Sequence, residues 1–353
     1  MPGLDLDAFV RALPKAELHL HLEGSVTPPL ARRLARRRGV ALPGVDGDDD
    51  RGDVRQAFPF VDFSGFLRLY LAIASCLHEA EDFCEIVEDL GLRLRAQGVD
   101  YAEVTFTPAL HRSRGVEIEP ILEGLKEGRR RVLERHDVLL RWVFDVVRIF
   151  PEQAEPTLEF ARAMERTDPG ATVGLGLAGP EDRPHEIGPL VPTFGRARAE
   201  GLHVLPHAGE LAGPERIWEV LTELSAERIG HGVRCLEDPT LVEHLRAEGI
   251  ALEVCPSSNV CLSVAPSWAE HPLPRLLDAG LAVTLGSDDP PLFDTDLVQE
   301  YVRAAEAFGW GPGRLRALAQ ASIEHAFMPP ERARRMRAAL AAQTDSSAST
   351  DGT

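Results

Sequence analysis

The chain has 353 residues, of which 44% are hydrophobic, and a formal net charge of −18. This acidic balance argues against binding to nucleic acid or to an anionic membrane surface, because both favour basic patches. The sequence has five cysteines but no C-x-x-C pair, no apolar signal region near its start and no apolar run long enough to span a bilayer. These features predict a cytoplasmic protein with reduced thiols.

Helix-like and strand-like segments alternate along most of the chain, after a short amphipathic helix at 5–13. The predicted strands are 15–21, 99–106, 139–146, 171–177, 202–207, 228–231, 250–255 and 281–288. The predicted helices between them are 27–39, 81–97, 117–136, 152–166, 186–200, 217–224, 239–248 and 272–279. This alternation predicts a parallel (β/α)8 TIM barrel of the α/β class. An open doubly wound sheet is disfavoured because no G-x-G-x-x-G follows an early strand.

We expect one catalytic domain over residues 1–343, followed by a disordered tail at 344–353 that is rich in serine, threonine and aspartate. Residues 46–53 form a polar, glycine-rich stretch that we interpret as a surface insertion, since its aspartates lack the spacing of an EF-hand loop. The densest aromatic segment is 58–67. Core packing is its ordinary explanation, and an apolar wall over a substrate pocket is the functional alternative.

Polar residues that suit a metal site follow several of the predicted strands. Two histidines one residue apart, as in His19-Leu20-His21, project from the same side of a strand. The other strand-end residues are His207 and Glu210, then His231, and finally Asp288 and Asp289. In a TIM barrel the active site lies at these ends of the strands. Each residue alone is common in a structural role, but together three imidazoles and a carboxylate favour zinc with a position left for water.

The segments that carry these residues resemble the adenosine/adenine deaminase family of the amidohydrolase superfamily. They are Pro14–Ser25, Leu177–Gly179, His207–Glu210, Arg228–Gly232, Glu253–Asn259 and Ser287–Pro290. They occur in the family's order across residues 10–330, nearly the whole chain. The resemblance implies a TIM barrel with one zinc ion that converts the 6-amino group of an adenosine-type nucleoside to a 6-oxo group and releases ammonia.

The resemblance also implies roles for individual residues. The implied zinc ligands are His19, His21, His207 and Asp288. The implied catalytic residues are Glu210, which would protonate purine N1, and the pair His231 and Asp288, which would orient and deprotonate the attacking water. The implied substrate contacts are His21, Glu23, Asp289 at N7 and the backbone N–H of Gly179 at N3.

General chemistry agrees with these roles. Zinc makes hydroxide available near neutral pH, which the attack on an aromatic carbon requires. Protonation of N1 needs an acid that stays protonated, and apolar surroundings raise the pKa of a glutamate such as Glu210. A cation nearby keeps His231 neutral, as a base must be. If Asp289 bonds to N7, either its carboxyl group or N7 itself must carry the proton.

Two departures from the family pattern leave the substrate open. Adenosine-specific members usually carry an aspartate at the position of Glu23, where it contacts the ribose 5′-hydroxyl. Their fourth strand typically ends Asp-Leu-Ala-Gly-Asp-Glu, whereas residues 176–181 here read Gly-Leu-Ala-Gly-Pro-Glu. Adenosine, adenine and a 5′-substituted adenosine such as 6-aminodeoxyfutalosine are all compatible. The aromatic segment 58–66 favours a nucleoside, because it offers surface to cover a sugar.

Other classes of protein fit less well. Zinc deaminases of the H-x-E type also need P-C-x-x-C, which this sequence lacks. Binuclear metallohydrolases of the same barrel often use a bridging lysine, but no lysine follows Lys126. A non-catalytic nucleoside-binding relative would be expected to have lost Glu210 or a metal ligand, and all of these are present. The sequence predicts no oligomeric state.

Overall fold

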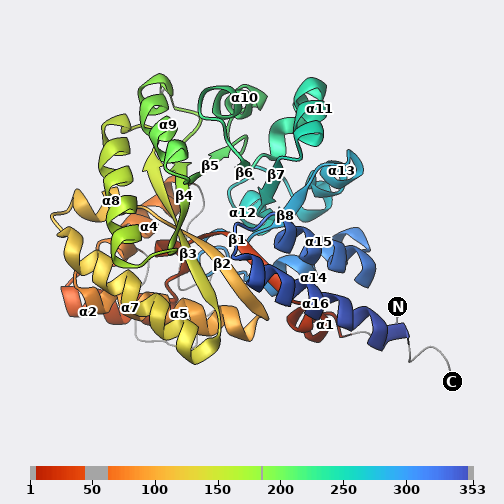
Figure 1. Cartoon of the computed structure of the whole chain (residues 1–353), viewed down its shortest axis with the longest axis horizontal. Coiled ribbons are helices and arrows are strands. Elements are labelled where there is room, and N and C mark those ends of the chain that lie inside the picture. The colour runs from red at the N-terminus through yellow and green to blue at the C-terminus, as the bar shows by residue number, and fades with distance from the viewer. Residues whose placement is uncertain (1–4, 44–62, 184–185, 349–353) are drawn as a thin grey trace.

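The computed structural model describes residues 5–43, 63–183 and 186–348, and its centre is one eight-stranded parallel sheet (Figure 1). The strands lie side by side in chain order: β1 Lys15–His21, β2 Val99–Phe106, β3 Leu139–Val147, β4 Thr172–Ala178, β5 His203–Ala208, β6 Arg228–His231, β7 Ala251–Val254 and β8 Val283–Leu285. A bridge between Leu20 and Asp288 joins the first strand to the segment after the last one. The sheet is thereby nearly closed, which confirms the predicted TIM barrel.

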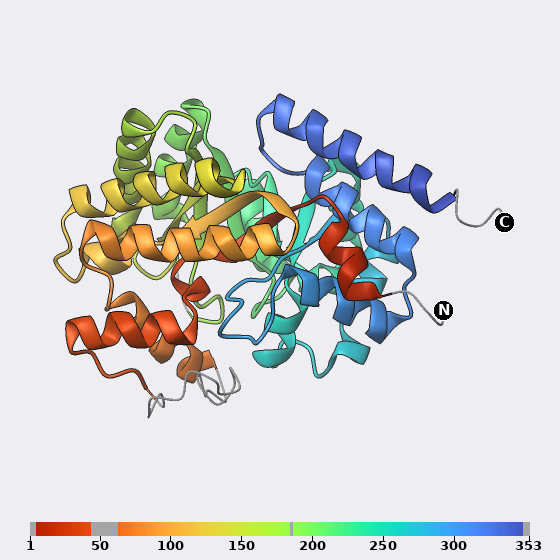
Figure 2. The same cartoon turned by 90° about the horizontal axis from the view of Figure 1, so that it is seen from below.

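Helices surround the strands on the outside of the barrel (Figures 1 and 2). The α-helices are α1 Leu6–Ala12, α2 Pro28–Arg38, α4 Phe63–Ala74, α5 Ala80–Ala96, α6 Pro108–Arg112, α7 Ile118–His136, α8 Ala154–Thr167, α9 Val191–Ala199, α10 Pro214–Glu223, α11 Pro239–Glu248, α12 Pro256–Cys261, α13 Leu273–Asp278, α14 Leu297–Phe308, α15 Pro312–Glu324 and α16 Pro330–Ala348. Short 3-10 helices are η1 Glu23–Ser25, η2 Pro151–Gln153, η3 Gly188–Leu190, η4 Val233–Glu237 and η5 Trp268–Glu270.

Prolines and glycines set several of these helix boundaries. Helix α2 has Pro28 in its first turn and ends at Gly39, which adopts φ of 66° as the left-handed cap. Helix α10 begins at Pro214, earlier than the predicted start at 217, since proline at the first helical position loses no hydrogen bond. The helix predicted at 186–200 is shorter, because the 3-10 turn η3 precedes α9.

Three further helices follow the last strand. Helix α15 packs against β1 and β8, so it supports the strands that meet where the barrel closes. Helix α16 runs to Ala348 and so extends into the stretch from Thr344 that we expected to be disordered. Residues 349–353, the loop 46–53 and the first part of the aromatic segment, 58–62, lie outside the described residues.

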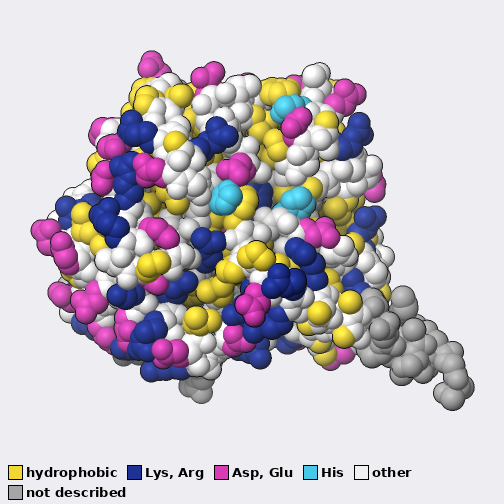
Figure 3. All heavy atoms as spheres, viewed as in Figure 1, with side chains coloured by type: hydrophobic (Ala, Val, Ile, Leu, Met, Phe, Trp, Pro, Cys, Tyr) yellow, Lys and Arg dark blue, Asp and Glu magenta, His cyan; other side chains and the backbone are white. Residues whose placement is uncertain are grey.

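The surface is mixed in charge on the face that Figure 3 presents, where acidic and basic side chains are interspersed. Within the residues that the structure describes, no helix combines the length and apolar character that crossing a membrane requires.

Candidate active site

A cavity of about 370 Å³ opens at the C-terminal ends of the strands. Its polar floor contains seven of the predicted site residues: His21, Gly179, His207, Glu210, His231, Asp288 and Asp289. Its wall is apolar and includes Phe63, Phe66 and Tyr70 from α4, with Leu110, Phe150 and Leu262. The described part of the aromatic segment 58–67 therefore lines the cavity, as the functional alternative proposed.

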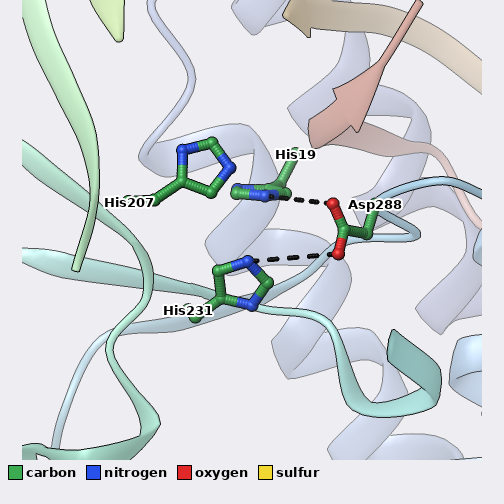
Figure 4. A group of neighbouring side chains, drawn as sticks. All are labelled: His19, His207, His231 and Asp288. Atoms are coloured by element: carbon green, nitrogen blue, oxygen red, sulfur yellow. Dashed lines mark ion pairs between the residues drawn. The ribbon is translucent and has the colours of Figure 1, made fainter. Parts of the chain in front are cut away.

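Four imidazoles and one carboxylate converge at the floor of this cavity, and Figure 4 shows all of them except His21. His21 Nε2 lies 3.1 Å from His207 Nε2 and 3.3 Å from Asp288 Oδ1. His19 Nε2 lies 3.6 Å from the same Asp288 oxygen. His231 approaches the other oxygen of Asp288 at 4.0 Å. The structure thus brings the four predicted metal ligands together, with His231 beside them.

The hydrogen bonds of two of these histidines fix which nitrogen faces the centre. His19 Nδ1 lies 2.8 Å from Glu253 Oε2, and His207 Nδ1 lies 3.1 Å from the Leu177 carbonyl. Each Nδ1 therefore carries the proton, and each Nε2 presents a lone pair to the cluster. His19 Nε2 is buried and has no hydrogen-bond partner among the described residues. An orphaned lone pair of this kind, facing a carboxylate and further imidazoles, fits a divalent metal ion.

The electrostatics of the cluster also favour a cation. Burial disfavours the charged form of His21, but the hydrogen bond to Asp288 and the other nearby acids outweigh it and raise the pKa of His21 to about 9. The same negative charge attracts a metal ion, which would take the place of these protons.

A buried chain of charges beneath the cluster holds His19 in place. Glu253 on β7 binds His19 and also accepts a hydrogen bond from the fully buried guanidinium of Arg228 on β6. Arg228 in turn donates to Glu103 on β2 at 2.5 Å. Because each charge has a partner, the network can remain ionised inside the barrel, and it orients the His19 ring from below.

Two of the site residues have left-handed backbone conformations. His231 and Asp288 both have φ of 61°. This region is uncommon for residues other than glycine, although histidine and aspartate enter it more readily than most. Such conformations persist where the surrounding structure enforces them, and they are typical of functional sites. His231 is the last residue of β6, and Asp288 is the residue that bridges to Leu20 of β1. Both side chains point towards the cluster.

Glu210 lies on a turn that a second buried glutamate holds together. Glu181 Oε1 accepts the backbone N–H of Gly209 at 2.8 Å. Its Oε2 accepts three more backbone N–H groups, from Glu210, Leu211 and Ala212 at 2.8–3.1 Å. Arg148, also buried, donates to the carbonyl of His207 at 2.6 Å. One carboxylate thus fixes the whole turn on which Glu210 is presented to the cavity.

The surroundings of Glu210 and Asp289 favour their neutral forms. Burial, together with the negative charges of Asp288 and Glu181, raises the pKa of Glu210 well above the usual value for glutamate. Burial and the charge of Asp288 likewise raise the pKa of Asp289 well above that of an ordinary aspartate. A neutral carboxyl group can donate a hydrogen bond or a proton, so both residues are suited to donate to nitrogen atoms of a ligand.

A relay of hydrogen bonds sets the tautomer of His231. The backbone N–H of Leu273 donates to His271 Nδ1 at 3.1 Å, so the His271 proton is on Nε2, which lies 3.1 Å from Asn259 Oδ1. The amide nitrogen of Asn259 therefore faces His231 Nδ1, at 3.4 Å. Burial lowers the pKa of His231 to about 3, so the ring is neutral. Its proton is then on Nε2, which points towards Glu210 and Asp288 at 3.8 and 4.0 Å.

We expect Asn259→Asp to lower kcat by roughly 100-fold, with little change in KM. The new carboxylate would accept the proton of His231 Nδ1 and so favour the opposite tautomer, with no proton on Nε2. The kinetics should be measured together with ¹⁵N NMR of the histidine nitrogens. Asn259→Leu removes the bond without reversing it and should cost less. Equal losses in the two variants would contradict a role for the tautomer.

Glu23 is placed differently from the other predicted substrate contacts. It is fully buried and does not line the cavity. Its Oε1 accepts hydrogen bonds from the backbone N–H of Thr107 and from His111 Nε2, both at 3.1 Å. The carboxylate thus lies behind Thr107, which does line the cavity. Its contact with substrate stays a prediction.

Sequence reasoning missed several residues that contact the site residues. Asp145 on β3 is fully buried, and its Oδ2 lies 4.0 Å from His21 Nδ1. Burial raises the pKa of Asp145 to about 7, although His21 opposes this. Glu181 was noted only as part of a motif, and His271 was not noted at all. An aspartate flanked by apolar residues, in Val143-Phe144-Asp145-Val146-Val147, was the available signal for Asp145, because an aspartate is almost never fully buried unless it is paired.

The barrel and its strand-end cluster of histidine and aspartate define the class of the protein, a TIM-barrel amidohydrolase. The chain belongs to the adenosine deaminase family, whose model, described as "Adenosine deaminase", matches residues 14–343. Members of this family are metal-dependent, and the chain is a hydrolytic deaminase of purines that acts on an amidine carbon–nitrogen bond.

Individual relatives resemble the chain over nearly their whole length. It is 38% identical over 330 residues to an aminodeoxyfutalosine deaminase of Streptomyces avermitilis, covering 92% of this chain and 90% of the relative. It is 39% identical over 321 residues to an adenine deaminase of Cupriavidus necator, covering 91% and 89%. The crystal structure of an adenine deaminase from Arthrobacter aurescens aligns with a TM-score of 0.86 at 32% identity, covering 94% of this chain and 99% of that one.

Proposed function

We propose that the chain deaminates the adenine ring of a 5′-substituted adenosine. The observation that carries this proposal is the burial of Glu23, whose position holds the 5′-hydroxyl partner in the adenosine-specific pattern. Its Oε1 is bonded to Thr107 and His111, and the buried side chain does not line the cavity, so it is not placed to bind a free 5′-hydroxyl. The apolar wall formed by α4 instead favours a less polar 5′-group.

The purine ring would be held by donors along the cavity floor. Asp289, kept neutral, would donate to N7, and the backbone N–H of Gly179 would donate to N3. Glu210 would transfer its proton to N1, which prevents negative charge from building up in the ring while water adds to C6. The C6–N bond then breaks and ammonia leaves, so the 6-amino group is replaced by a 6-oxo group.

The hydrogen-bond relay that begins at Leu273 suggests separate roles for His231 and Asp288 in orienting and deprotonating the attacking water. His231 has its proton on Nε2, so it would orient the attacking water by donating to its oxygen. Asp288 accepts hydrogen bonds only, so it would take the proton that the water loses. His21 lines the cavity beside both and would contact the substrate as well as the metal.

We propose zinc as the metal, held by His19, His21, His207 and Asp288. Nitrogen ligands with one carboxylate are typical of catalytic zinc. When bound, the ion would supply a nucleophile by lowering the pKa of a coordinated water molecule. We further propose a cytoplasmic location, which the five free cysteines support. The partner of the site would then be a small purine nucleoside, with neither nucleic acid nor membrane involved.

The substrate class can be tested by comparing kcat/KM for 6-aminodeoxyfutalosine, adenosine and adenine, using the absorbance change at C6 deamination. We expect the highest kcat/KM for the 5′-substituted nucleoside. Adenine is the second candidate, because several similar proteins, including those of Cupriavidus necator and Arthrobacter aurescens, are named adenine deaminases. A higher kcat/KM for adenine than for either nucleoside would overturn the proposal in favour of the free base.

We expect Glu23→Asp to raise the kcat/KM for adenosine relative to a 5′-substituted adenosine by roughly 3- to 10-fold, the effect of one hydrogen bond. The shorter side chain cannot reach both Thr107 and His111, so the cavity wall in front of it becomes more polar and better suited to a hydroxyl group. Glu300→Asp is the matched control, since Glu300 is equally buried and also accepts a backbone N–H. An unchanged ratio in Glu23→Asp would reject the idea.

A further inference from the structure

Asp145 on β3 is a fully buried carboxylate whose two oxygens have no hydrogen-bond partner among the described residues. Burying such a group without a partner is costly, so a partner is expected when the protein is in its working state. The basic atom beside it is His21 Nδ1, 4.0 Å from Asp145 Oδ2. The other nitrogen of the same ring, Nε2, faces His207 and Asp288 in the cluster.

The space for this carboxylate is provided by a glycine on the neighbouring strand. Gly176 on β4 is the direct register partner of Asp145 on β3. A Cβ atom built on Gly176 would lie 1.9 Å from Asp145 Oδ1, so no side chain fits at 176 while Asp145 keeps its place. Position 176 is also where the adenosine-specific pattern has an aspartate. The carboxylate is thus contributed by β3 in this chain, and the glycine on β4 makes room for it.

We propose that Asp145 is a positioning residue for His21, accepting a hydrogen bond from its Nδ1–H so that Nε2 is aimed at the metal. A small rotation of either side chain brings the two groups to hydrogen-bond distance. A carboxylate behind a metal-binding histidine fixes the orientation of the ring and makes it a stronger ligand. Glu253 has the same relation to His19, and the Leu177 carbonyl has it to His207. This inference rests on the proposed metal site.

The carboxylate can be moved from β3 to the facing position on β4 by mutation, which gives a direct test of the proposal. The four variants are D145N, D145A, G176D and the double variant D145A/G176D. Zinc affinity should be measured by competition with a chelator, and the ligand field by the absorption spectrum of the cobalt-loaded protein. We expect D145N and D145A to bind zinc about 10- to 100-fold more weakly, with an altered cobalt spectrum. G176D alone should also bind more weakly, because two carboxylates then compete for one space.

The double variant should recover most of the affinity and the spectrum, because it returns a carboxylate to the same space from β4. E300Q is the control for the loss of a buried carboxylate elsewhere, and it should leave zinc affinity unchanged. D145N is isosteric with the natural residue, so it preserves the packing. Two results would overturn the inference when the wild-type chain binds zinc: D145N binds zinc equally well, or the double variant binds it no better than D145A. Either result leaves the proposed function standing. If the wild-type chain binds no metal, both fail.

Discussion

Replacing Glu210 with glutamine is expected to lower kcat by about 100- to 10,000-fold while the protein keeps its metal ion. Glutamine preserves the size of the side chain and can still donate a hydrogen bond, but it cannot transfer a proton to N1. Burial and neighbouring negative charge keep the pKa of Glu210 well above its usual value, so the natural residue carries that proton near neutral pH. The rate of deamination and the metal content should be measured on the same preparation.

Glu219→Gln is a suitable control for Glu210→Gln. Glu219 lies on α10, outside the cavity, and is paired with Arg216 at 2.7 Å. This variant should retain full activity, because a partly buried ion pair between residues three apart on one helix contributes little to stability and lies outside the cavity. Full activity in Glu210→Gln would remove the proposed acid from the mechanism, whereas loss of the metal in that variant would show that the residue acts on the cluster instead.

Replacing Glu181 with glutamine should reduce stability and activity together. Three backbone N–H groups point at Glu181 Oε2, and the amide oxygen of glutamine can take that position and still accept them. The amide nitrogen then takes the place of Oε1 and faces the N–H of Gly209, so that a donor meets a donor. Leaving a buried donor unpaired costs about 1–3 kcal/mol, so we expect a loss of this size in the free energy of unfolding. Movement of the turn that carries Glu210 should also lower kcat by about 100-fold. Denaturant unfolding and steady-state kinetics measure the two effects.

The pH dependence separates the two contributions of Glu181. Its negative charge helps to raise the pKa of Glu210. Without that charge the pKa of Glu210 falls, so Glu210 loses its proton at a lower pH and the alkaline decline in kcat should move to lower pH. Glu165→Gln is the control, since the Glu165 carboxylate likewise accepts backbone N–H groups, from Gly170 and Thr172, but does not line the cavity. An unchanged pH profile in Glu181→Gln would contradict the electrostatic part of the prediction.

Much of the fold and of the metal cluster could be predicted from the sequence, because both follow from where the strands lie in the chain and where each of them ends. Apolar runs identify the strands, and in a TIM barrel the residues that follow them meet at one end. His207, His231 and Asp288 were therefore assigned to one site although they are far apart in sequence. Their positions in the structure agree with that assignment. The strand boundaries were less accurate near β8, where the chain leaves the sheet to bridge to Leu20.

The contacts that hold the site residues in place could not be predicted, because they depend on the direction in which single side chains point. Glu181 binds backbone amides, which leave no pattern in the sequence. Asp145 occupies its place because its register partner is a glycine, and pairing between strands cannot be read from either strand alone. Glu23 is the first residue of the 3-10 turn η1 and does not line the cavity, so the contact that the family resemblance implied for it is not seen in the structure.

The most direct test of the account is to follow ammonia release and 6-oxopurine formation by the purified chain on a 5′-substituted adenosine, before and after removal of metal by a chelator. We expect one ammonia for each 6-oxo product, loss of both when the metal is removed, and recovery when zinc is added back. Undiminished turnover by the metal-free chain would contradict the role assigned to the histidine and aspartate cluster. Product without ammonia would contradict hydrolytic deamination itself.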